Sequence, residues 1–244
     1  MAKHQTRSPL SGKVALVTGA SRGIGLAIAR ALASEGCDLI ITGRTESALK
    51  TAGRKLSRKK VRVVTQVTDV RDPRSVHALA SVAKKQFRRV DILINNAGIS
   101  QPSLTVENLD YDTWRDVIDT NLTGMFLVTH EILPLMHRGG AIANNLSIAA
   151  TRVFPGLSAY DASKYGALGF TDTLREELRP KGIRVIALLP GATDTDIWNT
   201  LWPGAPRKKM MSSDTVARAV VCALSLPENS TVEELKLLPS SGTL

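Results

Sequence analysis

Short apolar runs rich in β-branched residues alternate along the chain with stretches in which apolar residues recur at helical spacing. The apolar runs lie at 14–18, 39–42, 61–65, 91–94, 141–144, 183–189 and 234–238. The helical patterns lie at 23–35, 46–58, 74–87, 111–137, 158–179 and 213–226. Strands that are apolar throughout indicate burial on both faces. The pattern therefore predicts an α/β fold, a Rossmann-like, doubly wound, mostly parallel seven-stranded sheet with helices on both faces.

The alternation continues without a linker, an internal repeat or a low-complexity segment, so residues 1–244 are expected to form one domain. Residues 1–11 are expected to be flexible, and they lack the apolar core of a signal peptide. No run approaches the roughly 18 apolar residues of a membrane span. The sequence therefore predicts a cytoplasmic protein that does not bind membranes.

A glycine-rich segment, Thr18-Gly19-Ala20-Ser21-Arg22-Gly23-Ile24-Gly25, connects the first predicted strand to the first predicted helix. Glycines permit a tight turn and let backbone approach a pyrophosphate, while the helix N-terminus offers unpaired N–H groups. The spacing is G-x-x-x-G-x-G, which differs from the best-known dinucleotide fingerprint. Glycines can also simply end a strand, but the position between strand and helix favours a phosphate-binding loop.

Further motifs follow in a fixed order. They are Asn95-Asn96-Ala97-Gly98 at the end of the fourth strand, Asn121 in the long helix, Ser147 after the fifth strand, Tyr160-Asp161-Ala162-Ser163-Lys164, and Pro190-Gly191 after the sixth strand. Together with the glycine loop, this set resembles the short-chain dehydrogenase/reductase family, in which the serine commonly precedes the tyrosine by the 13 positions (160 − 147) found here. The resemblance covers residues 12–240.

The resemblance implies reversible hydride transfer between a nicotinamide cofactor and a carbonyl/alcohol pair. Tyr160 would be the general acid in reduction and the base in oxidation. Its ordinary pKa of about 10 is high for exchange at pH 7, and the Lys164 cation, four residues later on the same helix face, is expected to lower it. Ser147 would hydrogen-bond the carbonyl oxygen. Asn121 would hold a break in helical hydrogen bonding and a water that links Lys164 to bulk solvent.

The end of the second strand bears on the choice of cofactor. NAD enzymes of this fold place an acidic residue there to bind the ribose hydroxyls, but here Gly43 and Arg44 follow Thr42. Arg44 and Arg22 suit a 2′-phosphate, so NADP(H) is favoured over NAD(H), although Arg44 alone would also fit an ordinary strand end. The expected cofactor-binding residues are Gly19, Ser21, Arg22, Gly23, Ile24, Gly25, Arg44, Asp69, Val70, Asn96, Ala97, Gly98, Tyr160, Lys164, Pro190, Gly191, Thr193 and Thr195.

Residues 191–212 are the least regular part of the chain, and in the resembled family this loop closes over the substrate. Its tryptophans, Trp198 and Trp202, either line an apolar pocket or anchor the loop. The expected substrate contacts are Ser147, Phe154, Tyr160 and Trp198, with Val153 and Leu157 beside Phe154 in a second wall. The chain end departs from the pattern of the family's 3-oxoacyl reductases, so a 3-oxoacyl substrate is one class among several.

The net charge of +10 suggests an anionic partner, and only 4% of residues are aromatic. The basic runs 54–62 and 84–89 support an alternative function, an acidic-partner or nucleic-acid binding protein on the same fold. Solvated helix ends explain such runs equally well, and few aromatics are present to stack bases, so no nucleic acid is expected. A cofactor-sensing regulator without turnover is disfavoured by the intact catalytic set.

Three further expectations concern metals, cysteines and assembly. The sequence has no H-E-x-x-H and no C-x-x-C, so no metal site is expected. Cys37 and Cys222 lie in apolar contexts and are expected to be small buried residues in a reducing compartment. The resemblance implies a homodimer or homotetramer formed through the helices at 111–137 and 158–179.

Overall fold

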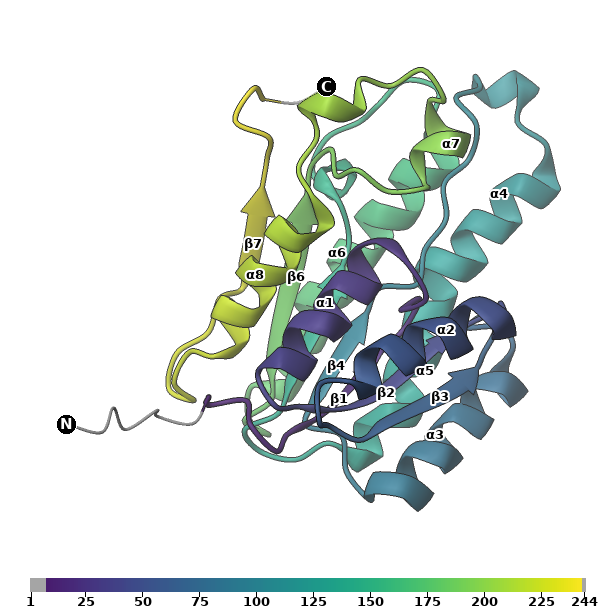
Figure 1. Ribbon diagram of the computed structural model, residues 1–244. Coiled ribbons are helices and arrows are strands. Elements are labelled where there is room, and N and C mark those ends of the chain that lie inside the picture. Colours follow the sequence, from purple (N-terminus) through teal and green to yellow (C-terminus); the bar gives the residue numbers. More distant parts are fainter. Residues whose placement is uncertain (1–7, 243–244) are drawn as a thin grey trace.

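The computed structural model describes residues 8–242, and these contain a single sheet of seven parallel strands. The strands follow the order β3-β2-β1-β4-β5-β6-β7 across the sheet (Figure 1). Their bounds are β1 (Val14–Val17), β2 (Asp38–Gly43), β3 (Val63–Val67), β4 (Ile92–Asn95), β5 (Ala141–Asn145), β6 (Arg184–Pro190) and β7 (Glu234–Leu237). The predicted α/β architecture is confirmed, and every neighbouring pair of strands is parallel.

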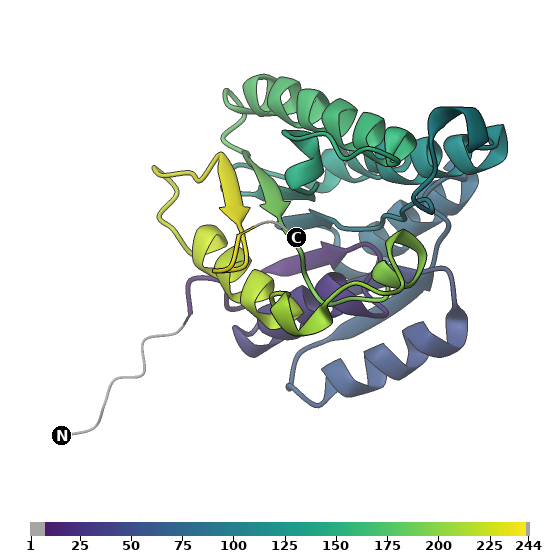
Figure 2. The ribbon, with the colours of Figure 1, turned by 90° about the horizontal axis from the view of Figure 1, so that it is seen from above.

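Eight α-helices in the described residues connect and cover these strands. They are α1 (Gly23–Ser34), α2 (Glu46–Ser57), α3 (Pro73–Phe87), α4 (Tyr111–Ile118), α5 (Gly124–Ile132), α6 (Ser158–Leu178), α7 (Trp198–Leu201) and α8 (Ser213–Leu224). Figure 2 shows the helices in two layers, one on each side of the sheet. Of the buried clusters, the largest joins the sheet to α1, α2 and α8, and the second largest joins it to α3, α5 and α6.

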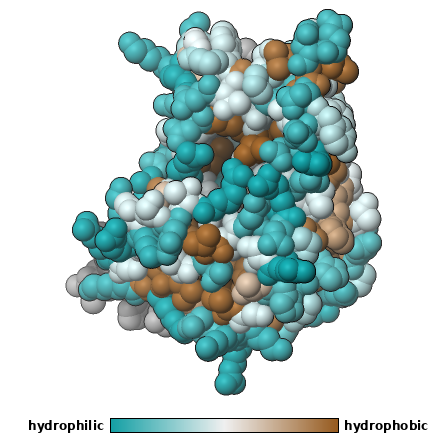
Figure 3. Space-filling view, turned by 90° about the vertical axis from the view of Figure 1, so that its right-hand side faces the viewer, coloured by the Kyte–Doolittle hydropathy of each residue, from teal (hydrophilic) through white to brown (hydrophobic). Residues whose placement is uncertain are grey.

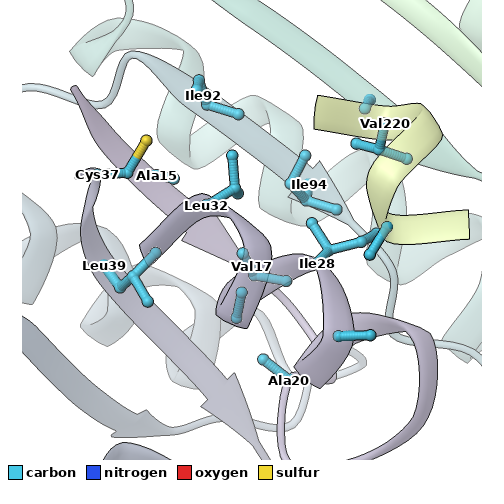
Figure 4. Close-up of a cluster of buried hydrophobic side chains, with 14 of the residues drawn as sticks. Ala15, Val17, Ala20, Ile28, Leu32, Cys37, Leu39, Ile92, Ile94 and Val220 are labelled. Atoms are coloured by element: carbon cyan, nitrogen blue, oxygen red, sulfur yellow. The ribbon is translucent and has the colours of Figure 1, made fainter. Parts of the chain in front are cut away.

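Successive residues of β1 supply these two clusters alternately. Ala15 and Val17 belong to the cluster that includes α1 and α8 (Figure 4). Val14 and Leu16 belong to the cluster that includes α3 and α5. Side chains point to opposite faces along a strand, so a strand covered on both sides must be apolar at every position. This burial explains why the strands were recognisable as continuous apolar runs.

The predicted continuous helix at 111–137 is wrong in one respect. The chain leaves α-helical geometry at residues 119–123, where a π-helical turn, η2 (Asp119–Thr123), separates α4 from α5, and a short 3₁₀ turn containing Pro134 follows α5. A π turn adds a residue to one turn of a helix, often at functional sites. Here a Cβ on Gly124 would lie 2.7 Å from Val70 Cγ2, so only glycine fits directly after this turn.

Other differences from the prediction are smaller. β3 begins two residues later than expected, at Val63, and the short helix α7 lies within the segment that had no regular pattern. The strand order reverses beside β1, since β2 and β3 lie on one side of it and β4 on the other. In open parallel sheets, ligands bind beyond the carboxyl ends of the strands at such a switch point. The fold therefore directs attention to the loops after β1 and β4.

Candidate active site

A cleft of about 1060 Å³ opens among the loops that follow the strands. Of the residues predicted for cofactor, catalysis or substrate, all but two line it. The lining members are Gly19, Ser21, Arg22, Gly23, Ile24, Arg44, Asp69, Val70, Asn96, Ala97, Gly98, Ser147, Phe154, Tyr160, Lys164, Pro190, Gly191, Thr193, Thr195 and Trp198. Gly25 and Asn121 lie behind this surface, and Val153, expected in the second wall, is 73% exposed and outside the cleft.

The glycine loop is shaped by close backbone packing. Gly19 has a φ of +63°, and a Cβ there would lie 2.9 Å from Ala97 Cα. Gly25 would place a Cβ 2.5 Å from Gly19 O and against the Asn96 amide. Gly25 therefore lets α1 approach the loop rather than lining the cleft. The N-terminus of α1 has no side-chain cap and no acidic residue in its first turn, as an anion-binding helix end requires.

Thr18, the first residue of the glycine-rich segment, connects the two loops at the switch point, a role that the sequence did not indicate. Its Oγ1 accepts hydrogen bonds from the backbone N–H groups of Asn96 (2.9 Å) and Ala97 (3.0 Å). The Asn96 side chain donates back to Thr18 O at 2.9 Å and accepts from Asn145 Nδ2 at 2.8 Å. These bonds tie the ends of β1, β4 and β5 together under the cleft.

Tyr160 and Lys164 lie one turn apart on α6, with Lys164 Nζ 5.4 Å from the centre of the Tyr160 ring. Lys164 Nζ donates a hydrogen bond to Asn145 O at 3.2 Å. Ser147 follows β5 and hydrogen-bonds Tyr160, while its Oγ accepts from Ala149 N at 3.1 Å. The three side chains predicted to react thus meet in the cleft, held by α6 and the end of β5.

Asn121 lies in the π turn and is fully buried. Its amide donates to Ile99 O (2.9 Å) and Ser163 Oγ (3.0 Å), and its Oδ1 accepts from Ile99 N at 2.8 Å. The predicted break in helical hydrogen bonding is present, and the side chain fixes the loop after β4 against α6. A water link from Asn121 to Lys164 stays a prediction.

Burial controls the protonation of Tyr160 and Lys164. It raises the pKa of Tyr160 to about 12, with a hydrogen bond from Ser147 opposing the rise, and it lowers the pKa of Lys164 to about 8. The expectation that the lysine cation lowers the pKa of Tyr160 is wrong. The pKa is raised instead, and desolvation of the phenol is the largest cause. At pH 7 the phenol is therefore protonated.

The cost of burying Lys164 yields a stability prediction for the nucleotide-free protein. A pKa that falls from 10.5 to about 8 corresponds to about 3 kcal/mol, and the hydrogen bond to Asn145 O offsets about 1 kcal/mol. We expect Lys164→Met to raise the free energy of unfolding at pH 7 by about 2 kcal/mol. Urea unfolding at several pH values measures this difference.

The sign of the pH dependence provides the control. Between pH 8 and 10.5 the unfolded chain binds more protons at Lys164 than the folded chain, so the wild type gains stability as pH rises. The advantage of Lys164→Met should therefore shrink over this window. Lys85→Met, on the exposed end of α3, should show neither effect. A Lys164→Met protein less stable than wild type at pH 7 would contradict the argument.

Gln101 is a buried residue that the sequence argument missed. Its Oε1 accepts hydrogen bonds from the backbone N–H groups of Ala159 (2.8 Å) and Tyr160 (3.1 Å), the first turn of α6. Its Nε2 donates to Gly156 O at 3.0 Å. Leu157, at the helix N-cap, provides no side-chain cap. Gln101 therefore caps the helix that carries Tyr160 from a loop 58 residues away.

Charged side chains border the part of the cleft beside β2 and β3. Arg44 follows β2, and Arg22 in the glycine loop lies 3.5 Å from the carboxylate of Asp196. Asp69 follows β3, and a hydrogen bond from Arg71 holds its pKa below the usual range. The basic runs 54–62 and 84–89 lie around the far ends of α2 and α3 and contribute nothing to the cleft.

The segment after β6 supplies both tryptophans, and the two interpretations of them hold together. Trp198 and Trp202 line the cleft, with ring centres 6.5 Å apart. Trp198 also anchors the segment, because its Nε1 donates to Thr193 O at 2.9 Å. Arg207 bonds Asp194 Oδ1 at 2.8 Å and Thr195 O at 2.6 Å, which fixes the fold of this segment.

The burial of the two cysteines can be compared with the expectation. Cys37 is buried as expected, but the expectation for Cys222 is wrong, because this side chain faces solvent on α8. Within residues 8–242 no three His, Cys, Asp or Glu side chains gather as a metal would require. The helices in the same range are too short or too polar to cross a membrane.

Comparison with known proteins decides the family. The sequence model of the short chain dehydrogenase family matches residues 13–205, from just before β1 to just beyond Trp202. The chain belongs to the short-chain dehydrogenase family. Its oxidoreductase fold and the position of the cleft agree with that membership, and the resemblance inferred from the motifs is confirmed.

Relatives of this short-chain dehydrogenase are named for different substrates. Sulfoacetaldehyde reductase 2 of Chromohalobacter salexigens is 34% identical, covering 93% of this chain and 94% of that protein. Glycine betaine reductase ATRR of Emericella nidulans is 36% identical over 96% of this chain, which spans only 19% of that protein's length.

Solved structures show the same breadth. An alcohol dehydrogenase from Thermococcus sibiricus complexed with 5-hydroxy-NADP has a TM-score of 0.88 and 33% identity, covering 94% of this chain and 97% of that one. A 3-ketoacyl-(acyl-carrier-protein) reductase from Brucella melitensis complexed with NADH has a TM-score of 0.85 and 28% identity, covering 95% and 98%. Nicotinamide cofactors of both kinds therefore occur among close structural neighbours.

Proposed function

We propose that this short-chain dehydrogenase transfers a hydride between NADP(H) and a carbonyl/alcohol substrate, with Tyr160 as general acid and base. The observation that supports this most is the meeting of Ser147, Tyr160 and Lys164 in one cleft, beside the uncapped N-terminus of α1. A proton donor, a hydrogen-bond donor and an anion site are thereby within one cavity, which is what carbonyl reduction needs.

The residues around the glycine loop fit a dinucleotide. Gly19 and Gly23 adopt positive φ, and any larger residue at Gly19 would collide with Ala97. Three buried polar atoms without a hydrogen-bond partner within residues 8–242 belong to residues of the cleft lining, and they are Thr42 Oγ1, Thr120 Oγ1 and Asn145 Oδ1. Backbone N–H groups of the first turn of α1 would hold the pyrophosphate. When bound, the nicotinamide supplies the hydride.

The protein residues would handle the proton and the developing charge. Tyr160, protonated at neutral pH because burial raises its pKa to about 12, would donate its proton to the carbonyl oxygen. Ser147 would donate a hydrogen bond to the same oxygen as negative charge builds on it. Lys164 would lie beside the phenolate that remains and favour it electrostatically, and by family resemblance would bind the ribose hydroxyls. These steps run in reverse for oxidation.

The preference for NADP(H) rests on the charges next to β2. Gly43 offers no carboxylate to bind ribose hydroxyls or repel a phosphate, and Arg44 and Arg22 both line the cleft. A guanidinium binds a phosphate through paired N–H donors. Asp69, the nearest carboxylate after β3, is already paired with Arg71. This distribution of charge favours a 2′-phosphate over a free ribose hydroxyl.

The assembly proposed for this enzyme is a homodimer or homotetramer through α4, α5 and α6. Large apolar side chains are exposed on these helices, and Tyr111 is the most exposed of them at 72%. The others are Trp114, Phe126 and Tyr165. Exposed apolar groups gathered on one set of helices are typical of a protein interface.

A cofactor-oxidation assay tests the proposed function. The purified protein is mixed with NADPH or NADH and a panel of aryl ketones, aliphatic ketones, 3-oxoacyl esters and quinones, and loss of absorbance at the reduced-nicotinamide band is followed. We expect turnover of at least one ketone, with a kcat/KM for NADPH at least tenfold above that for NADH. No turnover with either cofactor across the panel would contradict the proposal.

A further inference from the structure

The substrate end of the cleft differs in chemistry from its cofactor end. The charged side chains of the lining belong to Arg22, Arg44, Asp69, Lys164 and Asp196. Three of them, Arg22, Arg44 and Asp69, lie at the glycine loop or directly after β2 and β3. Lys164 lies against the Tyr160 ring at the reacting centre, with Nζ 5.4 Å from the ring centre, and Asp196 is paired with Arg22. Within residues 8–242, the rest of the cleft lining contributes no charged side chain.

One wall is an apolar shelf beside the reacting residues, formed by Pro102, Phe154, Pro155 and Leu157. Two hydrogen bonds to Gly156 O hold the two loops of the shelf together, one from Leu104 N and one from Gln101 Nε2, both 3.0 Å. Gly156 has a φ of +87°, and Phe154 N donates to the buried carboxylate of Asp161 at 2.7 Å. The shelf is therefore formed before any substrate arrives.

The other wall is a tryptophan wall formed by Trp198, Leu201, Trp202 and Pro203. Trp202 lines the cleft and is 48% exposed, so part of its apolar surface is still in contact with water. The indole N–H of Trp198 is already bonded to Thr193 O, so that ring has only apolar surface left to offer. Figure 3 shows hydrophobic residues inside a hollow on this side of the molecule.

Resting on the proposed function, we propose that the substrate is a neutral carbonyl compound with an aromatic or branched apolar group, and that carbonyl compounds with an anionic group beyond the reacting carbon are rejected. The apolar group would lie between the shelf and the tryptophan wall, where it replaces water on the exposed indole. An anionic group there would lose its hydration and find no cation, since the arginines of the cleft lie at its cofactor end.

A matched pair of ketones tests this inference. Methyl 4-acetylbenzoate and 4-acetylbenzoate present the same aryl ketone and differ in the charge at the far end. We expect kcat/KM for the ester to exceed that for the carboxylate by at least 100-fold at pH 7 with NADPH. Equal values, or a preference for the carboxylate, would overturn the substrate inference and leave the proposed hydride transfer standing.

A charge introduced into the tryptophan wall provides the converse test. Leu201 is half-buried in the short helix α7, so a longer side chain has access to solvent. Leu201→Arg should raise kcat/KM for 4-acetylbenzoate at least tenfold and lower it for the ester. Leu201→Gln, of similar polarity but uncharged, should lower the ester value without the gain for the carboxylate. A gain in both variants, or in neither, would contradict the assignment of this wall.

A binding measurement separates the inference from the proposed function. With NADP⁺ present, quenching of tryptophan fluorescence reports that a ligand occupies the tryptophan wall. The double variant Trp198→Phe with Trp202→Phe is the control, because it lacks both fluorescent rings of that wall. If neither ketone is reduced but the ester alone quenches the fluorescence, the proposed hydride transfer fails and the apolar site is upheld. If the ester neither reacts nor quenches, or the carboxylate quenches as strongly, the inference itself is overturned.

Discussion

Tyr160→Phe is expected to lower kcat by at least 1000-fold while NADPH still binds. The change removes one oxygen from a half-buried ring, so the packing of α6 is kept and the proton donor is lost. Ser147 retains its own donor, but a hydrogen bond cannot replace a transferred proton. Steady-state reduction of an accepted ketone measures kcat, and quenching of protein fluorescence by NADPH measures cofactor affinity.

Two controls make this result specific. Tyr165→Phe, five residues further along α6 and 43% exposed, should leave kcat within twofold of wild type. Circular dichroism should show that Tyr160→Phe keeps its helix content. Turnover of Tyr160→Phe within tenfold of wild type would mean that another group supplies the proton, and the assigned mechanism would be wrong.

The combined change Gly43→Asp and Arg44→Ala is expected to reverse the cofactor preference. The carboxylate would accept hydrogen bonds from ribose hydroxyls and repel a 2′-phosphate, and the loss of Arg44 removes the opposing cation. The ratio of kcat/KM for NADPH to that for NADH should fall by at least 100-fold. A Cβ at residue 43 would meet Ser21 Oγ at 3.4 Å, an ordinary contact, so the change fits the loop.

The single variants and a remote arginine control this experiment. Arg44→Ala alone should weaken NADPH at least tenfold in KM and leave NADH almost unchanged. Arg54→Ala, on the exposed side of α2, removes an equal charge away from the cleft and should alter neither cofactor. An unchanged ratio in the double variant would show that the end of β2 does not select the cofactor.

The strands and the cleft residues could be predicted from sequence because each depends on local pattern. A strand such as β1, buried on both faces, is apolar throughout, and motifs after successive parallel strands must meet at one edge of the sheet. The interruption at 119–123 was not predictable in the same way. Val117, Met125 and Val128 are buried at intervals that an uninterrupted α-helix would also give, so the extra residue of the π turn leaves no mark on the apolar pattern.

Features that depend on distant contacts escaped the sequence argument. Gln101 lies in a stretch without periodicity, and its role as a cap requires α6, more than fifty residues away. The pKa of Tyr160 depends on how completely the ring is buried, which the four-residue spacing to Lys164 does not reveal. Cys222 faces solvent because Val220, Ala223 and Leu224 occupy the buried side of α8. A helical projection of residues 213–224 could have indicated this.

A row of buried amides beneath the cleft also bears on how the sheet assembles. Asn95 at the end of β4 donates at 2.9 Å to Asn144 Oδ1 on β5, and Asn144 donates at 2.9 Å to Thr171 Oγ1 on α6. Parallel strands are joined by long crossovers, so no tight turn sets their alignment. A shift of β4 against β5 by one residue would turn these amides toward the apolar face. They would then be buried without hydrogen-bond partners. The row therefore acts as a register mark that discriminates against misaligned sheets during folding.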